Sequence, residues 1–164
     1  MRTTIVPLGL GILLISSCLK KENCATLENK IVPAQEQQDL ANYLSTNNIQ
    51  ATLHSSNLYY QVLEQGTGVV PSLCESIEVA YEGKLTSGTI FDSNKDAFFS
   101  FNGLIEGWKI GIPLIKTGGR IRLFIPPTLG YGSTAFEEGG IVRIPKNSIL
   151  IFDCTFLCAL DRFY

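Results

Sequence analysis

The sequence is poor in the residues and motifs that most enzymes use for acid–base, nucleophilic or metal chemistry. It contains a single histidine, His54, in a polar stretch, and it has no CxxC pair. The motifs GxSxG, HExxH and GxGxxG and the phosphate-binding P-loop are all absent. We therefore expect a solvated His54, no metal site, no cofactor and no hydrolysis by a Ser/His/Asp arrangement.

The sequence also lacks a strong charge of either sign. Its net charge is −2 and its pI is about 5.4, and no basic stripe is present, so nucleic acid is not an expected partner. The 164 residues are enough for one domain with a short helical extension. A hydrophobic content of 45% allows a substantial core, while 15 glycines and 7 prolines indicate the tight turns of a β-rich fold.

The apolar run near the N-terminus is too short to cross a membrane as a helix. It covers 11 residues, 5–15, and follows Arg2, which is typical of the hydrophobic region of a secretory signal. Ser16-Ser17-Cys18 resembles a bacterial lipobox, so we predict a signal peptide at 1–17 and a lipid anchor on Cys18. The alternatives are an ordinary signal peptide or a buried N-terminus. Because Leu19 is not acidic, the outer membrane is favoured over the inner one.

Lipidation of Cys18 would leave four cysteines, Cys24, Cys74, Cys154 and Cys158. An even number in an exported chain predicts at least one disulfide bond, although three pairings are open. Cys154 and Cys158 are expected on one face of a strand, too far apart to bridge each other. The alternative is that several are buried free thiols.

The hydrophobic periodicity predicts one helix followed by a sheet. Residues 19–32 are predicted to be a tether, and a helix begins at Pro33, carries Leu40, Tyr43 and Leu44 on one face, and ends at 45–48. Further on, the pattern predicts strands at 58–63, 77–82, 99–101, 120–125 and 149–157, a short helix at 104–112, and a loop up to Gly140. The most apolar strand, 149–157, is expected to be central. The expected fold class is α+β, with an antiparallel sheet around one short helix.

Aromatic residues stand out against this background, and the strings around them resemble a known family. Tyr81 lies in VAYEG, Phe91 in GTIFDSN, Trp108 in LIEGW, Tyr131 in IPPTLGYG and Phe152 in ILIFD. Five such strings in this order are similar to the FKBP family of peptidyl-prolyl isomerases over about 58–160. The resemblance implies an isomerase domain at 58–164, preceded by a tether and helical extension at 18–57.

The resemblance also implies a twisted sheet wrapped around the helix and a proline-binding pocket. Trp108 would form the floor, and Asp92 would be the acidic residue beside it. Leu104 and Ile105 would offer backbone groups, Tyr131 its hydroxyl, and Ile144 would close one rim. The expected catalytic set is Tyr81, Phe91, Asp92, Trp108, Tyr131 and Phe152, and the expected substrate-binding set is Phe99, Leu104, Ile105 and Ile144. An alternative role for Asp92 is structural, as support for the FDSN turn or in an ion pair.

The implied activity is acceleration of X–Pro bond rotation in exported proteins, with proline-containing polypeptides as partners and macrolides as candidate inhibitors. This sequence departs from the family in residues 132–143, which are enlarged, with Glu137 and Glu138 expected at the tip and Arg143 near the rim. That departure favours one alternative, a module that binds proline-containing segments without turnover. A third possibility is a structural envelope lipoprotein whose aromatic residues are only core.

Overall fold

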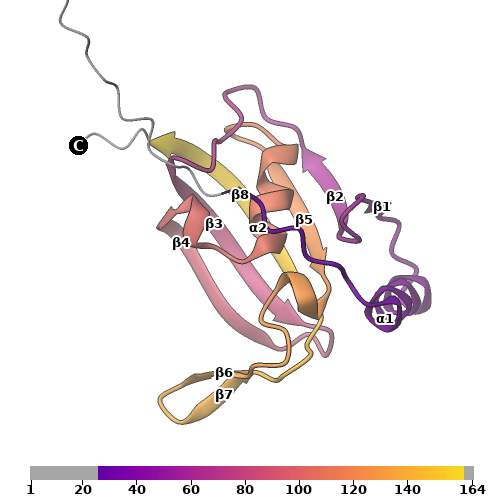
Figure 1. The fold of residues 1–164 in the computed structure, drawn as a ribbon. Coiled ribbons are helices and arrows are strands. Elements are labelled where there is room, and N and C mark those ends of the chain that lie inside the picture. Colours follow the sequence, from indigo (N-terminus) through magenta and orange to yellow (C-terminus); the bar gives the residue numbers. More distant parts are fainter. Residues whose placement is uncertain (1–25, 161–164) are drawn as a thin grey trace, which may run out of the picture.

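The computed structural model describes residues 26–160, and its centre is a six-stranded antiparallel sheet (Figure 1). The predicted signal peptide at 1–17, Cys18 and Cys24 lie outside the described residues. The order of the strands is β1-β2-β5-β8-β3-β4. Their bounds are Thr52–Leu53 for β1, Tyr59–Glu64 for β2, Ser76–Leu85 for β3, Ile90–Ser100 for β4, Arg120–Ile125 for β5 and Leu150–Leu160 for β8. The apolar strand β8 lies between β5 and β3, so the prediction of an antiparallel sheet with this strand inside it is confirmed.

One face of the sheet, called the front face here, is covered by the short helix α2, Glu106–Gly111, and the 3-10 turn η2, Ile112–Leu114. The helix packs so closely on β5 that a Cβ atom at Gly107 would lie 2.6 Å from the Ile125 side chain. Alternate residues of β5 and β8, such as Leu123 and Phe152, fill the core beneath it. The predicted helix at 104–112 is therefore present but begins two residues later.

The opposite face, called the back face, is covered by helix α1, Ala34–Thr46. Leu40 and Leu44 of α1 pack against Phe124 of β5 and Ile151 of β8. The Glu36 carboxylate also accepts hydrogen bonds from the backbone N–H and the hydroxyl of Thr128, at 2.8 and 2.9 Å. Thr128 lies in the 3-10 turn η3, Pro127–Leu129. These contacts show that the predicted helical extension packs against the sheet.

The segment 26–32, predicted to be a tether, instead packs on the domain. Val32 is 2% exposed and belongs to the main core. The N–H of Glu28 donates to the Glu106 carboxylate at 3.3 Å, and Figure 1 shows this indigo segment passing over α2. Beneath it, Glu106 forms a buried ion pair with Lys109. The mixed, charged composition of 26–32 concealed this contact, because Glu28 and Lys30 remain partly exposed and pair with each other, while the Glu28 N–H and the Val32 side chain contact the domain.

One strand prediction and one loop prediction need correction. The strand predicted at 99–101 is the end of an 11-residue strand, β4, and Phe101 starts the 3-10 turn η1, Phe101–Gly103. The first part of β4 is polar because it is an edge strand, paired only with β3. The predicted loop up to Gly140 contains strand β6, Phe136–Glu138, which forms a hairpin with β7, Ile141–Ile144. This hairpin projects from the sheet in Figure 1.

The cysteines divide into two groups. Cys74 is in a disulfide bond, whereas Cys154 and Cys158 are free thiols. Cys154 is buried in the core, but Cys158 pairs with Glu78 across a bulge between Phe156 and Cys158, and its thiol lies 3.2 Å from the Glu78 carboxylate. The bulge moves Cys158 to the other face, so the prediction that the two thiols share a face is wrong.

His54 lies between β1 and β2 and is half-buried. Its Nδ1 accepts a hydrogen bond from the backbone N–H of Ser56 at 3.1 Å, which ties down the turn. Within residues 26–160, no helix combines the length and the apolar character that a membrane crossing requires.

Candidate functional site

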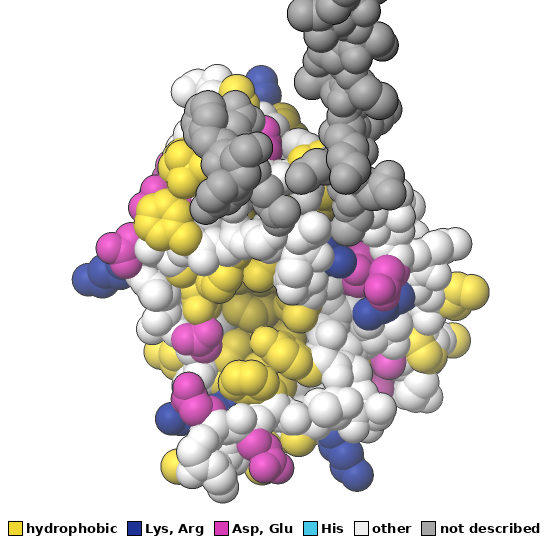
Figure 2. Space-filling model, turned by 60° about the vertical axis from the view of Figure 1, so that its left-hand side comes forward, with side chains coloured by type: hydrophobic (Ala, Val, Ile, Leu, Met, Phe, Trp, Pro, Cys, Tyr) yellow, Lys and Arg dark blue, Asp and Glu magenta, His cyan; other side chains and the backbone are white. Residues whose placement is uncertain are grey.

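A cavity of about 260 Å³ opens on the front face beside α2, and Figure 2 shows a hollow there lined with hydrophobic side chains. Twelve residues line the cavity: Tyr81, Phe91, Asp92, Phe99, Gly103, Leu104, Ile105, Trp108, Tyr131, Phe136, Ile144 and Phe152. All ten residues that the sequence predicted for a pocket are among them. These ten residues come from strands β3, β4, β7 and β8, helix α2 and the loops before α2 and β6. The fold therefore brings together distant parts of the chain.

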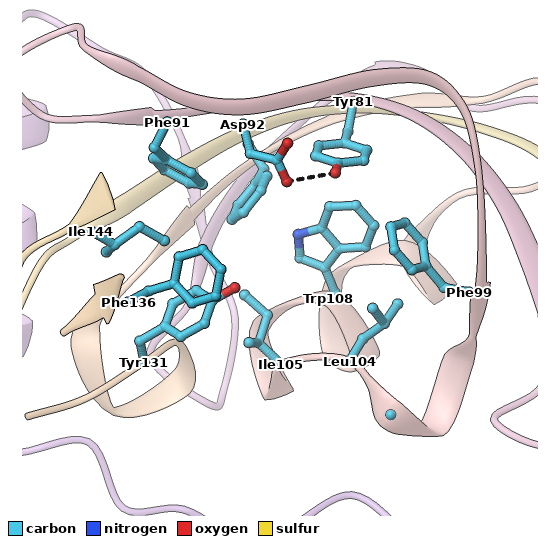
Figure 3. Close-up of a pocket in the computed structure, with 12 residues that line it drawn as sticks. Tyr81, Phe91, Asp92, Phe99, Leu104, Ile105, Trp108, Tyr131, Phe136 and Ile144 are labelled. Carbon is cyan, nitrogen blue, oxygen red and sulfur yellow. Dashed lines mark hydrogen bonds between the residues drawn. The ribbon is translucent and has the colours of Figure 1, made fainter. Parts of the chain in front are cut away.

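The floor of the cavity is the Trp108 indole, which is 3% exposed. Its centroid lies 5.2 Å from those of Tyr81 and Phe152, at interplanar angles of 80° and 88°. Phe99 lies 5.8 Å away at 90°. Three rings therefore stand at steep angles to the indole, and Figure 3 shows two of them, Tyr81 and Phe99, beside Trp108. The indole N–H has no hydrogen-bond partner among the described residues, so edge-to-face ring contacts hold the floor in place.

The far wall is formed by Phe91, whose ring meets Phe152 at 5.4 Å and 83°. This contact depends on Gly83, because a Cβ atom there would lie 2.6 Å from the Phe91 ring and 2.7 Å from Phe152. Gly83 pairs with both Asp92 and Phe152 across the sheet, so it sits directly behind the wall. Sequence analysis did not single it out, although it is the last letter of the VAYEG string.

Asp92 lines the cavity and accepts a hydrogen bond from the Tyr81 hydroxyl at 2.6 Å (Figure 3). Burial, and then the hydrogen bond to Asp92, hold the pKa of Tyr81 well above its ordinary value. The phenol is therefore a neutral donor at physiological pH. No lysine or arginine of residues 26–160 forms an ion pair with Asp92. The observed partner of the Asp92 carboxylate is the Tyr81 hydroxyl. The alternative of an ion pair with a basic residue is therefore not seen among residues 26–160.

Tyr131 stands across the cavity, and Figure 3 shows its hydroxyl pointing inward. Burial, followed by the charge of Asp92, raises the pKa of Tyr131. This phenol is therefore also protonated at neutral pH and can donate a hydrogen bond to a ligand. The Phe136 ring packs against it at 5.5 Å. Phe136 was missed because it falls in a segment predicted to be loop.

Backbone groups at the start of α2 complete the site. The N–H of Leu104 donates to the Phe101 carbonyl at 3.3 Å, and the Ile105 carbonyl accepts from Trp108 and Lys109. The N–H of Ile105, by contrast, donates to no backbone acceptor within residues 26–160. Ile105 lines the cavity, so its N–H is a donor that a bound carbonyl group would satisfy.

The rim differs from the sequence prediction in two ways. The tip of the hairpin is Gly139-Gly140, both with positive φ, and Glu137 and Glu138 lie in β6. Arg143 does not line the cavity, because its side chain extends to Glu138, with Nε 3.4 Å from the carboxylate. Ile144, by contrast, is 1% exposed and closes the rim with its aliphatic side chain.

Comparisons with known proteins agree with this geometry. The family model described as FKBP-type peptidyl-prolyl cis-trans isomerase matches residues 70–157. The isomerase FkpA of Aeromonas hydrophila is 41% identical over 106 residues, which are 62% of this chain and 38% of that protein. The FKBP-type 22 kDa isomerase of Escherichia coli is 38% identical over 106 residues, which are 62% of this chain and 50% of that protein. The chain thus matches about two fifths to one half of the length of these curated relatives.

Solved structures show the same fold. The crystal structure of FkpA from Escherichia coli superposes with a TM-score of 0.67 at 34% identity, covering 78% of this chain and 61% of that one. The crystal structure of AtFKBP13 gives a TM-score of 0.62 at 31% identity, covering 68% and 99%.

Proposed function

This chain belongs to the FKBP-type peptidyl-prolyl cis-trans isomerase family, and we propose that it accelerates rotation about X–Pro peptide bonds in exported proteins. The observation that carries the proposal is the cavity itself, whose indole floor has three aromatic rings standing around it. At about 260 Å³ it lies near the lower end of the roughly 300–1,000 Å³ typical of ligand sites, which suits one small apolar ring and its neighbours.

This reaction needs no nucleophile. An X–Pro amide resists rotation with a barrier of roughly 18–20 kcal/mol because resonance holds it planar. That resonance places partial negative charge on the carbonyl oxygen, and the charge diminishes as the bond twists. An apolar aromatic cavity therefore disfavours the planar amide more than the twisted one, which lowers the barrier.

The polar groups at the edge of the cavity would position the peptide. We assign the Tyr131 hydroxyl and the Ile105 N–H as donors to peptide carbonyl groups, since neither needs to change its protonation state. Asp92 would act by fixing the Tyr81 ring, with which it shares the 2.6 Å hydrogen bond. Phe91, Phe99 and Phe152 would contact the prolyl ring, while Leu104 and Ile144 limit the space beside it. A macrolide with a comparable ring would compete for the same cavity.

We further propose that the enzyme is an envelope lipoprotein, with a signal peptide at 1–17, a lipid anchor on Cys18, an extension at 18–57 and the isomerase domain at 58–164. The lipobox-like Ser16-Ser17-Cys18 supports the anchor, and Leu19 favours the outer membrane. The Cys18→Ser variant should yield a folded domain that no longer sediments with membranes. A variant that stays membrane-bound with its leader removed would contradict the assignment of Cys18.

The activity is tested with a short Ala-Pro peptide, by following its cis-to-trans conversion in a protease-free assay. Uncatalysed conversion takes tens to hundreds of seconds, so catalysis is readily seen. We expect the chain to shorten this time in proportion to its concentration. A folded chain that binds the peptide and leaves the rate unchanged would point to a second function, a module that binds without turnover. The exposed apolar side chains of the hairpin, such as Phe136 and Ile141, are the observation that favours that alternative.

A further inference from the structure

We propose that the β6–β7 hairpin holds a second site, which binds an apolar side chain of the same polypeptide whose proline occupies the cavity. This inference rests on the proposed function and specifies part of its substrate. The site consists of Phe136 and Ile141, and the residue it takes lies two or three positions from the proline.

The register of the hairpin determines which side chains share a face. Phe136 pairs with Ile144, Glu137 with Val142, and Glu138 with Ile141. Paired residues point to the same side of a two-stranded sheet, and successive residues alternate. Phe136 and Glu138 share one face of β6, so their partners Ile144 and Ile141 lie on that face, while Val142 lies on the other. Ile141 and Ile144 can share a face although they are three residues apart, because the register shifts between Phe136 and Glu137 and one residue of β7 is extra.

The apolar surface on this face is continuous with the cavity. Phe136 and Ile144 both line the cavity, and Phe136 also contacts the ring of Tyr131 (Figure 3). Ile141 pairs with Glu138, which lies two residues beyond Phe136 on β6, or about 7 Å along a strand. A client chain in extended conformation advances by the same distance for every two residues, so its side chain two or three positions from the proline would reach Ile141.

These side chains are available to a ligand. Phe136 is 42% exposed and Ile141 is 59% exposed, although both are large and apolar. The ion pair between Glu138 and Arg143 borders them and leaves a narrow apolar strip within a polar surface. Such a strip fits one aliphatic or aromatic side chain of an unfolded segment.

The test uses peptides in which one leucine is moved along a host of alanine and glutamine that contains a single Ala-Pro bond. We measure kcat/KM in the protease-free assay with wild type, Ile141→Gln and Val142→Gln. Two kinds of peptide are compared in the wild type: one with leucine two or three residues from the proline, on either its N-terminal or its C-terminal side, and one with leucine six residues away. The near leucine, on one of the two sides, should give a kcat/KM about fivefold higher than the distant leucine. Ile141→Gln should reduce this ratio to about one, and Val142→Gln should leave it unchanged.

The outcomes separate the two proposals. A wild type that accelerates every peptide equally would overturn the second site and leave the isomerase intact, whereas one that accelerates none would overturn both. If Val142→Gln lowered the ratio of kcat/KM between near and distant leucine as much as Ile141→Gln does, the effect would come from the stability of the hairpin. The face that carries Ile141 would then not be a binding site, and the inference would be overturned. Sedimentation that shows a dimer broken by Ile141→Gln would assign the strip to a second copy of the chain and likewise overturn the inference.

Discussion

Both faces of the sheet carry an apolar cluster, but one cluster is covered and the other borders an open cavity. On the back face, Phe124 and Ile151 are covered by Leu40 and Leu44 of α1, and the cluster is closed. On the front face, Phe152 follows Ile151 directly on β8 but points into an open cavity. Aromatic and aliphatic side chains are therefore present on both sides. What distinguishes the site is that the short helix α2 leaves part of the front face open, as the cavity beside it.

The clusters also differ in composition. The back cluster buries Leu40, Leu44 and Ile151 with a single ring, Phe124, and Tyr43 and Tyr59 pack at its edge. The front cavity has a tryptophan with three rings at 80–90° to it, an arrangement that keeps its shape while one side is open. Removing residues from each cluster should therefore affect stability in both but activity in only one.

The largest effect is expected at the floor of the cavity. Trp108→Ala should lower the free energy of unfolding by about 3–5 kcal/mol, because the indole is buried under three rings. Isomerase activity should be lost with the floor. Urea unfolding monitored by circular dichroism and the Ala-Pro assay check the two effects, and a folded variant with full activity would contradict the role of Trp108.

The matching change on the back face is Leu40→Ala. Leu40 is fully buried between α1 and the sheet, so we expect a loss of about 2–5 kcal/mol in the free energy of unfolding. At temperatures where the variant remains folded, kcat/KM should equal that of the wild type. A tenfold loss of activity in the folded variant would show that the cavity depends on α1, and the contrast between the faces would then fail.

A smaller effect is expected for Tyr131→Phe, which removes one hydroxyl from the rim of the cavity. The loss of one hydrogen bond to the peptide should cost about 0.5–1.5 kcal/mol, or roughly 2- to 13-fold in kcat/KM. Stability should change little, because this hydroxyl has no partner among the hydrogen bonds of residues 26–160. The corresponding control is Tyr43→Phe beside the back cluster, which should keep full activity.

The sequence was sufficient for most strands of the sheet and for ten of the twelve residues that line the cavity. Strand 120–125 was predicted at its observed bounds, because alternating apolar residues lie between a Gly-Gly turn and two prolines. The ten cavity residues followed from a family resemblance, since each lies in a recognisable string. Periodicity alone would have assigned most of these aromatic residues to the core.

The parts that could not be predicted depend on contacts between distant segments. Val32 looked like part of a tether because its burial depends on α2, about seventy residues later in the sequence. The face of Cys158 depends on a bulge that no local pattern reveals. Phe136 and Ile141 form a hairpin only because Gly139 and Gly140 adopt positive φ, which the sequence permits but does not require.

The most direct test of the account compares the same substitution on the two faces, Phe91→Leu in the cavity wall and Phe124→Leu in the back cluster. Both replace a phenyl ring with an aliphatic side chain, and both sites lie outside α2. At a temperature where both variants are fully folded, we predict that kcat/KM for the Ala-Pro peptide falls about tenfold or more in Phe91→Leu and stays at the wild-type value in Phe124→Leu. Equal activity in the two variants would contradict the assignment of the front cavity as the site of isomerisation.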